Sequence, residues 1–542
     1  TASIIGKKFS YEMLLNMTKK NENELLDDLI DCREVCLIEE SDSDYIFIHD
    51  KVREVLENEI KEKYPSFWKE LHQKAGEFLE EKYSSNLDEV LDELANHFYN
   101  AEDLEKSIKY LELAGDKARK NFLNEKAIEH FDKLVKILEK EFAKTNKNDI
   151  RFDQMQKSLY DAYFNRGSIF YQIGKMDDAL TDYFLAKKII EQMNDKRNLI
   201  ELLHAIGWCY LFTGDVDNAL YYFEKELKIT EVMNSKITLA KTFNSLSIAY
   251  RNRGNYEKHI EYNKRSLETL HDLDDDYYLQ SVYLNLGIGY RMQGDYEKAL
   301  ECYHKSLKVL EKNKNTEGHE FMKTGFVLYL NFGLVQREQG NFDEAIKYYK
   351  KGMKISDEMG DKSGLASLIW EIGIIYYYKK KYEEALEYID QAIKIQKEFN
   401  LSNNLYFSLT LKIDILFDQK KYSEIQKIYE ALLKCLPKNL SYASEDAKVY
   451  QARISFHLAK TEKLKIVKGI RPLEQMLKEK KDEGWIAGLN YALWKLKREL
   501  TAKQAKDADQ NRKAALKLYR KFYQKIPKIY YKNKIEELEK LN

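Results

Sequence analysis

Cysteine and proline are both scarce in this sequence. The chain of 542 residues has four prolines and five cysteines, Cys32, Cys36, Cys209, Cys302 and Cys435. Scattered cysteines in odd number argue against a disulfide framework and indicate a reducing compartment, so we expect a cytoplasmic protein. With so few prolines, long spans of the chain can form continuous helices.

Long apolar runs are also lacking. The longest candidate, Gly364 to Tyr378, is interrupted by Glu371 and is shorter than the roughly 18 residues that span a bilayer. We therefore expect no membrane partner. The chain begins at Thr1, inside what reads as a structured element, so we expect it to be part of a longer protein.

Motifs for catalysis, for metal binding and for a phosphate-binding loop are missing from the sequence. The patterns G-x-x-x-x-G-K-[ST], G-x-S-x-G and H-E-x-x-H do not occur. Cys32 and Cys36 have no second cysteine or histidine pair to complete a zinc site. Acidic and basic residues are interspersed and the net charge is −1, which argues against a nucleic-acid-binding face. We expect no enzymatic activity, no cofactor, no metal and no nucleic-acid partner.

A repeated segment is the main feature that the sequence does have. Residues 284–307, LNLGIGYRMQGDYEKALECYHKSL, recur as near-copies around turns of the form G-[DN]-[YF]-[DE]-x-A. Successive turns lie 40, 40, 40, 46, 40 and 40 residues apart, at Gly174, Gly214, Gly254, Gly294, Gly340, Lys380 and Lys420. A fixed period of this size predicts a solenoid of amphipathic helix pairs. The six extra residues near Lys312 to His319 predict an enlarged loop.

Each copy has small residues where two helices are expected to pack closely. They stand seven residues before the turn and again after it, at Gly167, Gly207, Ser247, Gly287, Gly333 and Gly373, and at Ala179, Ala219, Ala299, Ala345 and Ala385. We expect these two sets to face each other, and the turn residue to end the first helix in the left-handed conformation. Asp215, Asn255, Asp295 and Asn341 are expected to cap the second helix.

These glycine, aromatic, turn and alanine positions resemble the tetratricopeptide repeat. The resemblance implies an all-α fold, a right-handed α-solenoid of about seven repeats with a concave surface for proteins or peptides. The chain departs from the usual period of ~34 residues and lacks the proline that closes a repeat. The longer form is similar to that of kinesin light chains, bacterial peptide-pheromone receptors and signalling ATPases.

The first residues follow another pattern. Phe9–Met17 and Glu22–Arg33 predict helices, Val35–Glu39 and Tyr45–Ile48 predict two strands joined by a polar turn, and His49–Ile60 predicts a further helix. Two helices, a two-stranded wing and a helix describe a small winged-helix domain.

The segments ASIIGKKFSYEMLL, LLDDLIDCREVCLIEE and YIFIHDKVREVLENEI look like the winged-helix segment of STAND-type signalling ATPases. The resemblance implies an upstream nucleotide-binding domain as a partner, and a role for His49 and Asp50 in sensing the diphosphate of bound nucleotide. An imidazole can donate a hydrogen bond to a phosphate oxygen. The alternative, which the missing phosphate-binding loop favours, is that His49 only precedes a helix whose positive end Asp50 stabilises.

Four segments are therefore predicted. They are a winged-helix-like domain at 1–62, helical repeats leading to the array at 63–150, the tetratricopeptide array at 151–440, and degenerate helical hairpins with a C-terminal cap at 441–542.

The concave face of the array is the predicted binding groove. In the tetratricopeptide pattern, the first helix of each repeat lines this face. Its positions fall on Asn165, His204, Trp208, Phe212, Arg251, Asn285, Arg291, Asn331, Arg337, Trp370, Tyr377 and Tyr378. Asparagine amides can pair with a peptide backbone, arginines suit carboxylates, and aromatic rings can anchor apolar groups. We predict an acidic or carboxylate-bearing peptide or partner segment. The alternative is that the arginines pair with acids of neighbouring repeats and lock the superhelix.

Together these features predict a non-catalytic, protein- or peptide-binding sensor and regulatory arm of a STAND-like cytoplasmic signal-transduction protein. A free-standing tetratricopeptide scaffold or peptide receptor is the alternative. A phosphate-binding loop upstream of Thr1 would favour the first hypothesis.

Overall fold

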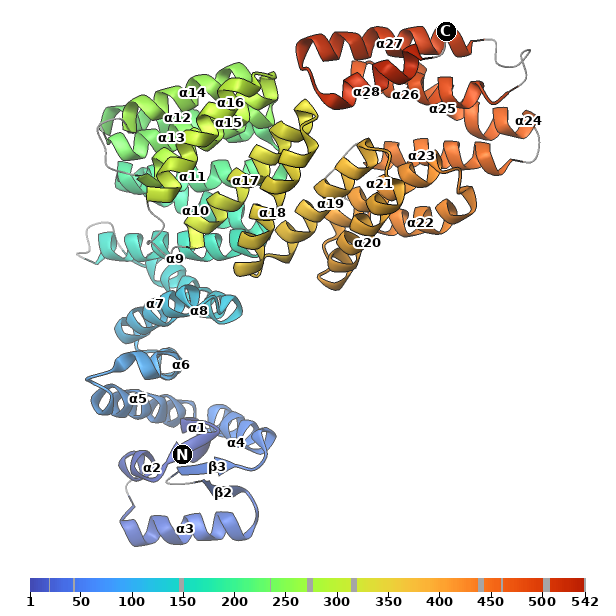
Figure 1. Ribbon diagram of the computed structural model, residues 1–542. Coiled ribbons are helices and arrows are strands. Elements are labelled where there is room, and N and C mark those ends of the chain that lie inside the picture. Colours follow the sequence, from blue (N-terminus) through green and yellow to red (C-terminus); the bar gives the residue numbers. More distant parts are fainter. Residues whose placement is uncertain are drawn as a thin grey trace. The chain divides into compact units, whose positions relative to one another are not determined.

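The computed structural model describes residues 1–18, 20–41, 44–145, 151–233, 235–270, 276–312, 319–436, 443–459, 462–500 and 507–540. The enlarged loop predicted near Lys312 to His319 falls largely outside these residues. The chain divides into two compact units, Thr1–Ile229 (unit 1) and Thr230–Asn542 (unit 2). Helices dominate both units (Figure 1), and each unit is described by itself.

Unit 1 begins with a small sheet and its helices. The elements are α1 (Ala2–Ile5), β1 (Lys8–Ser10), α2 (Tyr11–Met17), α3 (Glu22–Glu34), β2 (Ile38–Ser41), β3 (Asp44–Phe47) and α4 (Asp50–Lys63). The strand order is β1-β3-β2, with both pairings antiparallel. Phe9, Leu14, Leu25, Ile38 and Phe47 share one apolar core.

The predicted order of elements agrees with this arrangement except at its start. The sequence predicts that Phe9 begins a helix, but Phe9 lies in β1 and pairs with β3. The third strand gives β3 a hydrogen-bonding partner on both edges. Ser10, the last residue of β1, then caps α2, because its hydroxyl accepts a bond from the Met13 backbone nitrogen at 3.2 Å. The winged-helix assignment stays a prediction.

The rest of unit 1 is a run of helices that pack on their neighbours in the chain. They are α5 (Pro65–Lys82), the 3-10 helix η1 (Leu87–Val90), α6 (Leu91–Ala101), α7 (Leu104–Lys120), α8 (Asn124–Phe142), α9 (Phe152–Gln172), α10 (Met176–Met193), α11 (Lys196–Thr213) and the greater part of α12 (Val216–Met233). One apolar core extends through this unit from α1 to α11.

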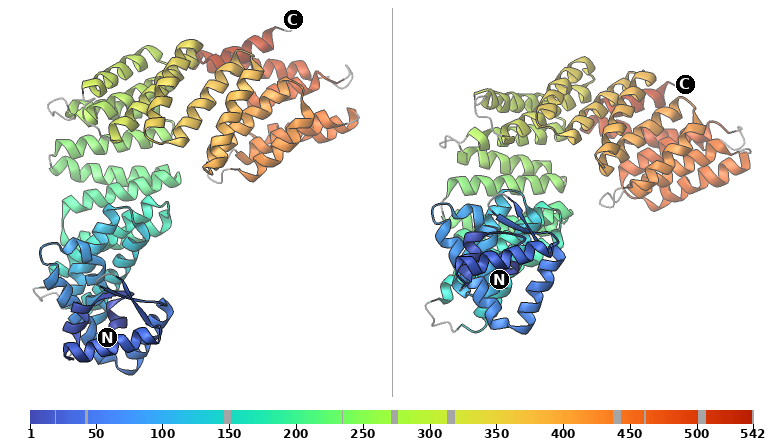
Figure 2. Two further views of the ribbon diagram at one scale, coloured as in Figure 1. Left: turned by 60° about the horizontal axis from the view of Figure 1, so that its bottom comes forward. Right: turned by 90° about the horizontal axis from the view of Figure 1, so that it is seen from below.

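Unit 2 continues the helix pairs and ends in a group of C-terminal helices. The elements are α13 (Lys236–Asn252), α14 (Tyr256–Leu270), α15 (Asp276–Gln293), α16 (Tyr296–Lys312), α17 (His319–Gln339), α18 (Phe342–Glu358), α19 (Lys362–Tyr378), α20 (Tyr382–Glu398), α21 (Ser402–Asp418), α22 (Tyr422–Lys434), α23 (Ala443–Leu458), α24 (Glu462–Lys465), the π-helix η2 (Ile466–Ile470), α25 (Arg471–Glu479), α26 (Glu483–Lys497), α27 (Ala508–Lys525) and α28 (Ile529–Glu539). Each helix of α13 to α22 packs on the next, as Figures 1 and 2 show. The last helix, α28, packs on α27 and also contacts α17.

The turns inside the pairs have the predicted left-handed residue. The five turn glycines, from Gly174 to Gly340, have φ between 78° and 87°, and the lysines that replace glycine, Lys380 and Lys420, have φ of 59° and 61°. The next residue bonds back across the turn, as the Asp215 nitrogen does to the Tyr210 oxygen at 2.9 Å. This geometry satisfies carbonyl groups at the helix end and sets the direction of the second helix.

Three of the four predicted N-caps are present. The carboxylate or amide oxygens of Asp215, Asn255 and Asp295 each accept a bond from the backbone nitrogen three residues later, at 3.0–3.2 Å. The prediction is wrong for Asn341, which makes no capping bond. Its amide nitrogen instead donates to the Gln336 side chain, in the preceding helix, at 2.9 Å.

Four of the predicted first-helix glycines face an aromatic ring, and Gly373 faces Ile389 at the same position. The predicted alanine lies close as well, with its backbone oxygen 3.1 Å from a Cβ built at Gly287. A Cβ added to Gly287 would lie 2.3 Å from Cε1 of Tyr303, and one added to Gly333 would lie 2.2 Å from Cε1 of Tyr349. Both rings are fully buried. The ring belongs to the residue four positions after the alanine, so the missing glycine side chain makes room for an aromatic ring between the two helices.

We expect Gly287→Leu to destabilise its repeat by about 1–3 kcal/mol, because no space is left beside Tyr303 for a larger side chain. Hydrogen exchange should accelerate in α15, α16 and their immediate neighbours, since each repeat contacts mainly the adjacent ones. Gly488→Leu in α26 is the matched control, because a Cβ there meets nothing within 4 Å. Equal acceleration in every helix of unit 2 would contradict a solenoid.

Candidate ligand-binding site

Three arginines stand on the first helices of consecutive pairs in unit 2, and we call them the arginine row. They are Arg251 in α13, Arg291 in α15 and Arg337 in α17. Nη1 of Arg291 lies 2.8 Å from Oε1 of Glu338, and Nε of Arg337 lies 3.2 Å from Oε2 of Glu371. Each glutamate comes from the next repeat, so two members of the row connect adjacent repeats.

These two ion pairs are largely buried. The side chains of Arg291 and Arg337 are 12% and 15% exposed. Burial lowers the pKa of Arg291 while the Glu338 carboxylate raises it, and the net shift is upward; Arg337 behaves in the same way beside Glu371. Arg291 and Arg337 therefore pair with acids of neighbouring repeats, which is the alternative that the sequence analysis left open.

Arg251 differs from the other two. Its side chain is half-buried, and within the described parts of the chain no carboxylate forms an ion pair with it. Burial lowers the pKa of Arg251, and the nearby positive charge of Arg291 lowers it further. The first position of the arginine row is therefore a cation without a counter-ion among the described residues.

The predicted groove asparagines of unit 2 form hydrogen bonds inside the array. Asn285 and Asn331 are 8% and 5% exposed. The Asn285 amide nitrogen donates to the Asn244 side chain at 2.8 Å, and that of Asn331 donates to the Val327 carbonyl at 2.8 Å. Their contact with a ligand stays a prediction. The Asn285 bond connects α15 to α13, whereas the Asn331 bond stays within α17.

The predicted aromatic residues of unit 2 also have internal contacts. The Tyr377 hydroxyl donates to Asp418 at 2.9 Å, and the Trp370 ring lies tilted against that of Phe407, with ring centroids 6.1 Å apart. The Tyr378 ring lies 6.2 Å from that of Phe342.

Four predicted groove residues belong to unit 1. Trp208 Nε1 donates to His204 Nε2 at 3.0 Å, which leaves the His204 proton on Nδ1, where it faces Glu226 at 3.2 Å. Asn165 contacts Asp116 at 3.5 Å. Phe212 is 68% exposed and is the most accessible member of the predicted groove in this unit.

The residues proposed to sense nucleotide lie at the start of α4. His49 precedes the helix, is exposed and makes no capping bond. Asp50 accepts a bond from Arg53 Nε at 2.8 Å, and this bond lowers the pKa of Asp50. Both interpretations of this pair stay open.

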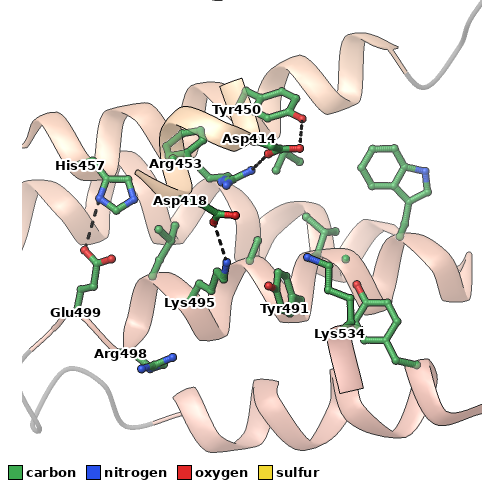
Figure 3. A pocket seen from close by; sticks show the side chains of 18 of the residues that line it. Asp414, Asp418, Tyr450, Arg453, His457, Tyr491, Lys495, Arg498, Glu499 and Lys534 are labelled. Atoms are coloured by element: carbon green, nitrogen blue, oxygen red, sulfur yellow. Dashed lines mark hydrogen bonds and ion pairs between the residues drawn. The ribbon is translucent and has the colours of Figure 1, made fainter. Parts of the chain in front are cut away.

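A cavity that sequence analysis missed lies at the C-terminal end of unit 2 (Figure 3). Its volume is about 840 Å³, and it lies between α21 and α23 on one side and α26 to α28 on the other. Tyr377 is the predicted groove residue that lines it. Residues 441–542 carry no repeat signature, and the spacing of Gly484 and Gly488 around Trp485 is the one local signal that could have indicated open space.

Ion pairs cross the wall of this cavity. Arg453 Nη1 lies 2.9 Å from Asp414 Oδ1, and Lys495 Nζ lies 3.4 Å from Asp418 Oδ1 (Figure 3). The ammonium of Lys534 lies over the Tyr491 ring, 3.9 Å from its centroid. Aromatic and apolar side chains lie beside these ion pairs, a combination typical of ligand pockets.

The parts of the chain that the structure describes contain no cluster of three histidine, cysteine, aspartate or glutamate residues that could hold a metal ion. In the same residues, the helices are too short or too polar to cross a membrane.

Comparison with known proteins identifies the repeats. The sequence profile of the tetratricopeptide repeat matches residues 158–231, 238–312 and 326–398, which fall within α9 to α20. The protein is thus an α-solenoid of helix pairs. The matched residues carry tetratricopeptide repeats. Among curated protein sequences, none matches this chain.

Three of the solved structures that match this chain have the following similarities. The apo form of RapI is 19% identical, with a TM-score of 0.42 over 51% of this chain and 97% of its own. The STAND protein PH0952 from Pyrococcus horikoshii, which has a tetratricopeptide-repeat sensor, is 17% identical, with a TM-score of 0.42 over 83% of this chain and 64% of its own. The apo quorum sensor NprR from B. thuringiensis is 16% identical, with a TM-score of 0.40 over 64% and 98%.

We expect Lys534 to give the protein a measurable pH dependence. Burial, followed by the charge of Lys495, lowers its pKa to about 8, below the ~10.4 of lysine in an unfolded chain. Between these values the unfolded state binds more protons, so the free energy of unfolding should rise with pH. Lys534→Met should remove this rise, and the exposed Lys532→Met should keep it. Urea unfolding from about pH 7.5 to about 10.5 measures the free energy of unfolding at each pH. Parallel pH profiles for wild type and Lys534→Met would contradict the expected role of Lys534.

Proposed function

We propose that the tetratricopeptide array binds a peptide or protein segment through a carboxylate that pairs with Arg251. The observation that carries this proposal is the missing counter-ion of Arg251, whose pKa is lowered while those of Arg291 and Arg337 are raised. A ligand carboxylate would supply that counter-ion. An arginine fork binds a carboxylate through two parallel hydrogen bonds.

The sequence of the next repeat explains why Arg251 is unpaired. Glu338, the partner of Arg291, lies five residues after Gly333, and Glu371, the partner of Arg337, lies two residues before Gly373. In the repeat that follows Arg251, these two positions hold Met292 and Asn285. Neither side chain carries a negative charge.

The charge around the arginine row supports the same ligand chemistry. Lys528, which precedes α28, lies 3.4 Å from Glu338 and adds a fourth cation to this region. Arg291, Arg337 and Lys528 pair with two carboxylates, Glu338 and Glu371, and Arg251 lies near Arg291, so the four cations and two acids have a net charge of +2. A positive cluster with buried members attracts acidic segments and increases their rate of association.

We further propose that the chain is the non-catalytic sensor and regulatory arm of a larger STAND-like signalling protein. The element order of residues 1–63 and the exposure of His49 and Asp50 support this context. In it, these two side chains would face the diphosphate in an upstream nucleotide-binding domain. A free-standing scaffold or peptide receptor is the second candidate, and the binding role of Arg251 is common to both.

Reversal of charge at Arg251 tests the binding role. The probes are fluorescent octapeptides with two acidic side chains and a free carboxyl end, together with versions in which these groups are amides. We expect the acidic peptides to bind the wild-type protein and Arg251→Glu to weaken that binding about tenfold or more. Lys264→Glu, an equal charge change on the exposed face of α14, is the matched control and should have little effect.

The same variants separate binding from folding. The melting temperature of Arg251→Glu should not fall, because the new carboxylate would stand beside Arg291 in place of a like charge. Fluorescence anisotropy and thermal unfolding are the measurements. Acidic peptides that bind Arg251→Glu as tightly as wild type, or amide versions that bind as tightly as the acids, would contradict the proposal.

A further inference from the structure

The cavity at the C-terminal end of unit 2 has the size of a small-molecule site. Its volume of about 840 Å³ is within the roughly 300–1,000 Å³ that ligand pockets enclose. It is built from α21 and α23 of the array together with α26, α27 and α28. The proposed function uses α13 to α17 and does not involve this cavity.

Aromatic and apolar side chains make up much of its wall. Phe417, Trp485, Leu489, Tyr491 and Tyr530 line it. Gly488 also lines it, and a Cβ built there meets nothing within 4 Å. The wall therefore offers both apolar surface and room for a ligand body beside α26.

The carboxylates that face this space already have partners. Asp414 pairs with Arg453 and accepts a bond from the Tyr450 hydroxyl at 3.1 Å. Asp418 pairs with Lys495 and accepts a bond from Tyr377.

Glu537 of α28 is also satisfied. It lies 3.2 Å from Lys495 Nζ and accepts a bond from the Tyr491 hydroxyl. Each of these three acids therefore has a cation and a hydroxyl group close to it.

Lys534 is the third cation beside three acids, because Lys495 pairs with both Asp418 and Glu537. It differs from the other two cations in making no direct contact with an acid that the structure describes. Among the residues that the structure describes, no carboxylate forms an ion pair with its ammonium group, which rests on the Tyr491 ring. In Figure 3 its side chain extends into the cavity, apart from the Arg453–Asp414 and Lys495–Asp418 pairs. Glu537, Asp414 and Asp418 act on this ammonium only from beyond ion-pair distance, so they compensate its burial incompletely.

The geometry points to this cavity as a binding site for a small organic carboxylate with an apolar or aromatic body. The carboxylate would pair with Lys534, and the body would lie against Trp485, Leu489 and the open surface at Gly488. The ligand class follows from the two features that the cavity combines, an ammonium without a direct ion pair among the described residues and an aromatic wall.

Matched acids and amides test this assignment on the wild-type protein. The probes are 3-phenylpropionate and N-acetyl-phenylalanyl-leucine with a free carboxylate, each compared with its amide by titration calorimetry at neutral pH. The fluorescence of Trp485, which lines the cavity, gives a second readout. We expect at least one acid to bind about tenfold or more tightly than its amide, because the amide cannot form the ion pair with Lys534.

Variants then locate the site. Lys534→Met keeps the length of the side chain and should abolish the difference between acid and amide, while the exposed Lys532→Met on the same helix should preserve it. Gly488→Trp should fill the cavity and block both probes, and Gly488→Ala should not. Arg251→Glu should leave the binding of these probes unchanged, so failure of this site and failure of the proposed array function are distinguishable.

Two results would overturn the inference. The first is that neither acid binds more tightly than its amide at concentrations up to the millimolar range. The second is that Lys534→Met, with a circular dichroism spectrum like that of wild type, retains the preference for the acid.

Discussion

Arg337 and Glu371 bring opposite charges into the interior of the array, and the contact between α17 and α19 includes both side chains. The Tyr349 hydroxyl donates a further bond to Glu371 at 3.2 Å, and the Tyr349 ring fills the space that Gly333 leaves open. The repeat thus combines a steric requirement with an electrostatic one. Loss of either charge would leave the other buried without a partner, which typically costs about 3–5 kcal/mol.

This constraint also explains how one member of the arginine row differs from the others. Where the next repeat has an acid within reach, the arginine forms an ion pair between repeats, as Arg291 does with Glu338. Arg251 is followed by a repeat with Asn285 and Met292 at the corresponding positions, and neither can form an ion pair with it. The same residue type at the same repeat position therefore has two different environments, and the neighbouring repeat decides between them. The proposed carboxylate site at Arg251 rests on this difference.

The periodic features of the fold could be predicted from sequence because they depend on local chemistry. Turn residues with left-handed φ follow from glycine spacing, and even Lys420 conforms because the repeat around it fixes the turn. Side-chain partners were harder to predict. In one repeat the alanine position holds His259, which is buried. It packs against Gly289, where an added Cβ would lie 2.6 Å from the His259 ring. The C-terminal cavity escaped prediction because residues 441–542 lack a period, and its lining comes from helices far apart in the chain.

A double-mutant cycle at Arg337 and Glu371 tests most directly whether these arginines are structural. Arg337→Met, Glu371→Leu and the double variant would be compared by the hydrogen-exchange stability of α17 to α20. Because each single change leaves a buried charge and the double change leaves none, we expect a coupling energy of about 0.5–3 kcal/mol, with the double variant more stable than the sum of the single changes predicts. Additive effects would show that the pair does not hold the repeats together, and would contradict the division of roles between Arg337 and Arg251.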